Sequence, residues 1–166
     1  TLFPGVWDVE ETFGETNGTV AAYLSAGKRA TLALRGGGKK IFGRFPYFEA
    51  ASIGTGSLGV GALDEPDFTV RGFRARRFLG ESSLYGTAEL RLRVGALKLV
   101  LPGHFGVLGF VDTGRVWLDG EESRAWHTGV GGGLWYSFLN DRSVFSVGLA
   151  HSKEDDLVYL KGGFTF

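Results

Sequence analysis

Two short segments of the chain carry an arginine, a carboxylate and glycines in an arrangement that could fix a loop. Val70-Arg71-Gly72-Phe73 lies in a long stretch punctuated by glycine and proline, and Phe110-Val111-Asp112-Thr113-Gly114 follows about forty residues later in a strand-like run. An unpaired charge in a low-dielectric interior costs several kcal/mol, so a buried arginine needs a carboxylate. The two segments therefore predict a loop fixed to a wall of the protein by a charge-assisted hydrogen bond.

A glycine-rich segment in the same loop carries a weaker signal. Gly54-Thr55-Gly56-Ser57-Leu58-Gly59 has the G-x-G-x-x-G spacing of dinucleotide-binding loops. That chemistry needs a helix whose N-terminus holds the pyrophosphate, and Gly59, Gly61 and Pro66 oppose one. Nucleotide binding is therefore not predicted.

Candidate catalytic and metal-binding residues are scattered. His104, His127 and His151 fall on three separate segments and are best interpreted as surface or interface residues. The acidic runs 64–67 and 153–156 fit solvated loops better than calcium sites. The sequence predicts no enzymatic activity, no metal site and no cofactor.

The composition of the chain further restricts the class of protein. The chain has 166 residues, 43% of them hydrophobic, which predicts one domain over residues 1–166. The absence of cysteine excludes disulfides and thiolate metal sites, and the equal numbers of Lys+Arg and Asp+Glu give no overall field that favours nucleic acid. No run approaches the roughly 18 apolar residues of a membrane-spanning helix.

The dominant pattern is an alternation with period two, which predicts β-strands. Between residues 84 and 94, leucine, glycine, alanine and valine occupy one face, and Tyr85, Thr87, Glu89, Arg91 and Arg93 occupy the other. The eight predicted strands cover about 6–13, 19–26, 30–39, 83–94, 105–118, 126–138, 143–151 and 157–166.

The connectors between these strands differ in length. Polar or long connectors are predicted at 14–18, 41–82, 119–125 and 152–156, and tight turns at 27–29 and 139–142. Long loops on one side and short turns on the other are typical of outer-membrane barrels. Aromatic residues near the strand ends would fit interfacial girdles: Trp7, Phe13, Trp117, Trp126, Phe138 and Phe166.

A soluble β-barrel or sandwich is the alternative, and the strand over 83–94 alone does not decide between them. Gly129, Gly131 and Gly133 share one face; they are poor core filler but suit a wall against which another segment lies. The sequence therefore predicts an antiparallel transmembrane β-barrel of about eight strands, whose long loop over 41–82 folds toward the lumen.

Four motifs and the terminal residue resemble a known family. They are Phe45-Pro46-Tyr47-Phe48-Glu49, Val70-Arg71-Gly72-Phe73, Gly86-Thr87-Ala88-Glu89, Phe110-Val111-Asp112-Thr113-Gly114 and the final Phe166. In this order and spacing they resemble the C-terminal barrel region of the BamA/TamA/FhaC-type outer-membrane insertase and two-partner-secretion transporter superfamily, also called the bacterial surface antigen family. The resemblance covers nearly the whole chain.

The resemblance implies the roles of particular residues. Arg71, beside Gly72 and Phe73, is expected to reach into the lumen and pair with Glu89, Asp112 or both, in a loop-to-lumen lock that includes Gly86, Phe110 and Gly114. Phe164 and Phe166 are expected to form the C-terminal signal that the barrel-assembly machinery reads. Arg74, Arg76 and Arg77 could contact lipopolysaccharide phosphates or complete the packing of the loop against lumen acids.

The family's full barrel has sixteen strands and follows periplasmic repeat domains, whereas eight strands are predicted here. An eight-stranded barrel is normally filled by its own side chains. The chain is therefore expected to be the C-terminal half or domain of a larger barrel protein, to associate with a second copy, or to have a lumen emptied by small residues.

Three functions follow for an integral protein of the bacterial outer membrane, in contact with its lipids and lipopolysaccharide. The first is to assist insertion or translocation of polypeptides, as the resemblance implies. The second is to anchor an upstream enzyme or partner domain in the membrane, and the third is a structural barrel or small passive pore.

Overall fold

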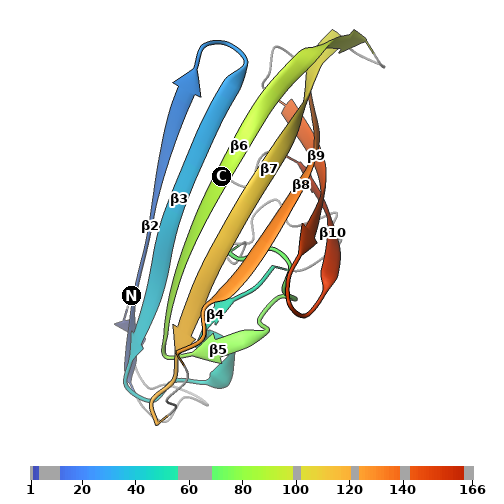
Figure 1. Ribbon diagram of the computed structural model, residues 1–166. Coiled ribbons are helices and arrows are strands. Elements are labelled where there is room, and N and C mark those ends of the chain that lie inside the picture. The colour runs from blue at the N-terminus through green and yellow to red at the C-terminus, as the bar shows by residue number, and fades with distance from the viewer. Residues whose placement is uncertain are drawn as a thin grey trace.

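One antiparallel β-sheet carries the described part of the chain. A computed structural model describes residues 2–3, 12–55, 69–98, 102–120, 124–138 and 143–162. The sheet strands are β1 (Leu2–Phe3), β2 (Phe13–Ala26), β3 (Ala30–Phe42), β6 (Ser82–Lys98), β7 (Pro102–Trp117), β8 (His127–Phe138), β9 (Ser143–His151) and β10 (Asp156–Gly162), hydrogen-bonded in that order. All neighbours are antiparallel, so the predicted all-β antiparallel class is confirmed (Figure 1).

The long connection between β3 and β6 forms a small layer of its own. It contains the 3-10 helix η1 (Tyr47–Glu49) and the short strands β4 (Ala51–Ile53) and β5 (Phe78–Gly80), which pair with each other. These strands lie at the end of the sheet where β3 stops and β6 starts, opposite the tight turn that joins β2 to β3 (Figure 1). Within the described residues, no helix has the length and apolarity needed to cross a membrane.

Alternation along the strands gives the sheet two chemically different faces. The polar face presents on β6 the side chains of Ser83, Tyr85, Thr87, Glu89 and Arg91, all of them buried. The opposite, apolar face exposes Leu84, Leu90, Leu92 and Val94 on β6, Val107 and Val111 on β7, Val130 and Leu134 on β8, and Phe145, Val147 and Leu149 on β9. The chain therefore exposes aliphatic side chains and buries ionised ones.

The long loop covers part of the polar face through two small clusters. Ile53, Val70 and Phe73 of the loop are buried with Tyr85 of β6, and Phe78 and Val116 pack against them. Phe13 at the start of β2 and Ile41 at the end of β3 form a second buried cluster with Ala51 of β4. The loop thus takes its position from apolar contacts at both of its ends.

The connector predicted at 14–18 is wrong. Residues 13–26 form one continuous strand that pairs with β3 along its length, with Gly18 opposite Gly38. In the sequence, Gly14 and Gly18 suggest a turn. In the structure, the pairing with β3 holds both glycines in an extended strand. Phe13, predicted to lie in an aromatic girdle, is buried against the loop, and residues 6–11 of the predicted first strand lie outside the described residues.

Candidate functional site

Arg71 joins the long loop to the middle of the sheet through Asp112. Its Nε and Nη2 donate to Oδ2 and Oδ1 of Asp112 at 2.6 and 2.8 Å, and its backbone N–H donates to the same Oδ2 at 3.0 Å. This is the two-pronged geometry in which a planar guanidinium matches a carboxylate. Both residues are buried, and the predicted pairing of Arg71 with Asp112 is confirmed.

Glu89 and Arg91 extend this contact to the neighbouring strand. Arg71 Nη1 donates to Oε2 of Glu89 at 2.7 Å, and Arg91 Nε donates to Oε1 of Glu89 at 2.8 Å. Glu89 and Asp112 are fully buried, and each of their four oxygens accepts a hydrogen bond. These four residues, named here the Arg71 network, carry two positive and two negative charges, so the buried charges are compensated.

Phe110 completes the surroundings of the Arg71 cation. The guanidinium carbon lies 3.3 Å from the centroid of the Phe110 ring. Burial disfavours the charged form, but the hydrogen bonds and charges of Asp112 and Glu89 outweigh it and raise the pKa of Arg71 above its ordinary value. Because both carboxylates accept from guanidinium groups, the arrangement is suited to holding a loop rather than to transferring protons.

The backbone next to Arg71 is held just as closely. Gly72 has φ of +92°, a conformation that favours glycine, and a Cβ there would lie 2.9 Å from Cβ of Ser152. Its N–H donates to the Tyr159 hydroxyl at 2.7 Å, and its carbonyl accepts from Ser152 Oγ at 2.7 Å. A Cβ at Gly129 of β8 would collide with the carbonyl of Arg71, so the predicted glycine wall receives the loop at this position.

The flanking residues Val70 and Phe73 anchor the loop by packing. A Cβ at Gly114 would lie 2.8 Å from Cγ2 of Val70, so the absence of a side chain on β7 makes room for the loop. Phe73 packs edge-on against Phe78 and His127, whose rings stack on each other with centroids 3.5 Å apart. His127 therefore packs as one of three rings in an aromatic cluster with Phe73 and Phe78.

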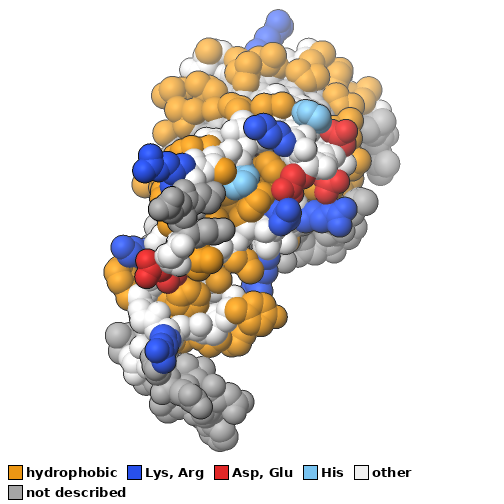
Figure 2. All heavy atoms as spheres, turned by 60° about the horizontal axis from the view of Figure 1, so that its bottom comes forward, with side chains coloured by type: hydrophobic (Ala, Val, Ile, Leu, Met, Phe, Trp, Pro, Cys, Tyr) orange, Lys and Arg blue, Asp and Glu red, His pale blue; other side chains and the backbone are white. Residues whose placement is uncertain are grey.

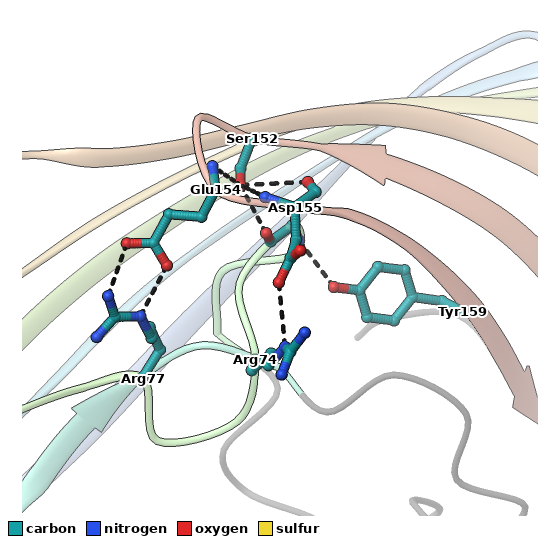
Figure 3. Close-up of polar contacts among 7 residues, drawn as sticks. Arg74, Arg77, Ser152, Glu154, Asp155 and Tyr159 are labelled. Atoms are coloured by element: carbon teal, nitrogen blue, oxygen red, sulfur yellow. Dashed lines mark hydrogen bonds and ion pairs between the residues drawn. The ribbon is translucent and has the colours of Figure 1, made fainter.

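A second, more exposed set of contacts ties the loop to the β9–β10 turn (Figure 3). Arg74 Nε donates to Oδ2 of Asp155 at 3.0 Å, and Arg77 donates to both carboxylate oxygens of Glu154 at 2.7 and 3.1 Å. Ser152 Oγ also accepts from the backbone N–H groups of Glu154 and Asp155, which shapes the turn. Figure 2 shows acidic and basic side chains gathered beside each other at this end of the molecule, with hydrophobic side chains around them.

The predicted lock residues converge, with one exception. Arg71, Gly72, Phe73, Glu89, Phe110, Asp112 and Gly114 all lie on the polar face or in the loop that covers it. Gly86 was predicted with them, but it lies on the other face of β6, opposite Gly36 of β3, because residues 85, 87 and 89 occupy the polar face. Phe164 and Phe166 and residues 56–68 lie outside the described residues.

Sequence reasoning missed the partners that come from the last hairpin. Tyr159 and Ser152 are separated from Gly72 by 87 and 80 residues, and neither belongs to a motif. The acidic run at 154–155 was interpreted as solvated, although its charge complements the basic run at 74–77. Among the described residues, no group of three or more His, Cys, Asp or Glu side chains is arranged to hold a metal ion.

Comparisons with known proteins add no relative. The chain matches no protein-family model, no curated protein and no solved structure.

Proposed function

We propose that the chain is the membrane-embedded part of an integral bacterial outer-membrane β-barrel protein of the BamA-like superfamily, which helps polypeptides insert into or cross that membrane. The observation that carries the membrane placement is the inverted burial of the sheet. Leu134 and Leu149 are 59% and 62% exposed, whereas Glu89 and Asp112 are 0% exposed. In water this distribution is unfavourable, and in a bilayer it is the expected one.

The dimensions of the apolar face support this placement. On β6 the exposed apolar positions run from Leu84 to Val94. At roughly 3.4 Å per residue this stretch is about 34 Å long, and at a tilt of roughly 40° it covers about 26 Å along the membrane normal. Outer-membrane barrels present an apolar band of about 25 Å.

The role in insertion or translocation rests on the motif residues and on the ends of the sheet. The Arg71 network joins the residues that the family resemblance pairs. In the described residues, the sheet order ends at β1 and at β10, and strands at such edges can pair with a further strand. In a bilayer these edges must be closed by each other, by a second copy or by strands of a longer protein.

Membrane anchoring is the second candidate, and the position of the loop favours it over a passive pore. Val70, Arg71 and Phe73 are buried against the polar face and fixed by several independent contacts. A segment held in this way obstructs a lumen. An anchor needs only a stable barrel, which the Arg71 network would supply.

The test begins with refolding in detergent and reconstitution into phospholipid vesicles. The folding rate of a separate eight-stranded outer-membrane barrel is then measured in vesicles with the chain, without it, and with its Arg71→Ala variant. A severalfold acceleration by the chain supports the insertion role. Stable, heat-modifiable protein without acceleration supports the anchor, whereas failure to associate with vesicles in a folded form contradicts the membrane placement.

A further inference from the structure

We propose that a basic hollow at the tight-turn end of the polar face binds a phosphate-bearing anion. The hollow has a volume of about 150 Å³, well above the roughly 10–15 Å³ that one water molecule needs. It is lined by Lys28, Arg29, Thr31, Arg91, Arg93, Trp135, Ser137 and Val144. It lies at the opposite end of the sheet from the β9–β10 turn.

Backbone pairing brings together the four basic residues of the lining, which are Lys28, Arg29, Arg91 and Arg93. Gly27, with φ of +65°, lets the chain turn sharply between β2 and β3, which places Lys28 and Arg29 at the rim. The backbone N–H of Arg93 donates to the carbonyl of Arg29 at 2.7 Å, so the turn is fixed to β6. Arg91 lies on the polar face of the same strand, two residues before Arg93.

The charges of the lining favour an anion. Glu89 already compensates Arg91 within the balanced Arg71 network. Lys28 and Arg29 add two exposed positive charges beside Arg93, and no carboxylate is present among the described residues that line the hollow. A cluster of positive charges attracts anions and repels metal cations.

The remaining lining residues define the kind of anion. Arginine side chains present paired N–H donors that match the oxygens of a phosphate, and the hydroxyls of Thr31 and Ser137 provide further polar groups. Trp135 forms a fixed wall, because its Nε1 donates to the carbonyl of Val107 at 3.2 Å. A tetrahedral phosphate group therefore fits this site better than an extended acidic peptide.

Two sources could supply the phosphate: a free or esterified phosphate in solution, or the headgroup of an anionic phospholipid. The apolar face exposes Val94 and Leu97 near the same end of β6, so a bilayer surface would adjoin the hollow. The lipid source rests on the proposed membrane placement. The site itself does not, because the β2–β3 turn and the adjoining part of β6 build its basic rim.

Trp135 supplies a local reporter for the test. Replacing Trp7, Trp117 and Trp126 by phenylalanine leaves Trp135 as the only tryptophan. Inorganic phosphate is titrated into the folded protein in detergent, with sodium chloride at equal ionic strength as the blank. Vesicles of phosphatidylcholine alone are then compared with vesicles that contain one third phosphatidylglycerol.

We expect a saturable change in Trp135 fluorescence, weakened about tenfold or more by Lys28→Gln/Arg29→Gln. Arg74→Gln/Arg77→Gln removes the same charge at the other end of the sheet and should leave the affinity unchanged. A response to free phosphate supports a soluble ligand, and a response only to phosphatidylglycerol supports the lipid headgroup. No response to either probe, or a response that the Lys28/Arg29 variant retains, overturns the proposal even where the protein inserts into membranes normally.

Discussion

The Arg71 guanidinium lies over the Phe110 ring at 3.3 Å, and Asp112, two residues further along β7, receives two of its donors. The ring therefore covers one face of the cation while the carboxylate engages its edge. Excluding water in this way strengthens the attraction between the charges and also makes the loss of either partner more costly.

Replacing Arg71 should strongly destabilise the folded state. Arg71→Ala leaves Glu89 and Asp112 buried with fewer compensating charges, which should lower the free energy of unfolding by about 3–5 kcal/mol. Arg71→Lys keeps the charge but cannot form the two-pronged pair, so its loss should be intermediate. Urea unfolding in detergent measures both, with the exposed Arg124→Ala as the control; equal stabilities for Arg71→Ala and wild type would contradict the role of the network.

A methyl group at Gly129 should displace the loop. The added Cβ would collide with the Arg71 carbonyl, and overpacking of this kind costs about 1–3 kcal/mol. Gly129→Ala should therefore expose the loop to trypsin, which cleaves at Arg74, Arg76 and Arg77. The matched control is Gly109→Ala, where the Cβ would meet only Gly131 O at 3.9 Å. Equal cleavage rates in the two variants would mean that the loop does not depend on this contact.

Removing one hydroxyl should loosen the attachment of the loop to β10. Tyr159→Phe deletes the acceptor of the Gly72 N–H and leaves a buried donor unpaired, at a cost of about 1–3 kcal/mol. Tyr136→Phe removes a longer and more exposed hydrogen bond, 3.3 Å to the carbonyl of Leu97, and should cost much less. Denaturant midpoints of the two variants give the comparison, and the expectation fails if Tyr159→Phe is the milder change.

A charge on the apolar face should separate the membrane placement from a soluble fold. In a bilayer, Leu134→Arg should destabilise the protein by about 2–4 kcal/mol if the position lies near the midplane. An exposed leucine in water tolerates the same change within about 0.5 kcal/mol. Folding equilibria into lipid vesicles measure the loss, with Leu134→Ala as the uncharged control. A neutral Leu134→Arg would count against lipid contact at this face.

The exposed pair between Arg77 and Glu154 should contribute little. The side chains are 52% and 35% exposed, so screening limits the pair to less than about 1 kcal/mol. Arg77→Glu should weaken the protein slightly at low salt, and the double variant Arg77→Glu/Glu154→Arg should restore it. Both effects should fade at 1 M salt, where the Debye length is about 3 Å. A large loss that persists at high salt would show that Arg77 acts through packing instead.

The sequence predicted those features that depend on local period or on charge compensation. The alternation over 84–94 assigned the faces of β6 correctly, the need of Arg71 for a carboxylate pointed to the segment of Asp112, and the family resemblance added Glu89. The continuous β2 was not predicted, because the sequence alone does not distinguish glycines within a paired strand, such as Gly14 and Gly18, from glycines in a turn.

Contacts made only by tertiary folding could not be predicted in the same way. The hydroxyl of Tyr159 reaches Gly72 because the sheet brings β10 and the loop together, and no local pattern encodes that approach. Gly86 was misplaced because it shares a motif with Glu89 while pointing to the opposite face.

The pairing of β6 with β7 sets Glu89 opposite Phe110 and Thr87 opposite Asp112. Because side chains alternate between faces, a shift of either strand by one residue would carry one of the two carboxylates to the apolar side. Arg71 would then find only one of its partners, and the attachment of the loop would be weakened. The complete Arg71 network forms only over correctly aligned strands, so docking of the loop favours the native register of β6 and β7.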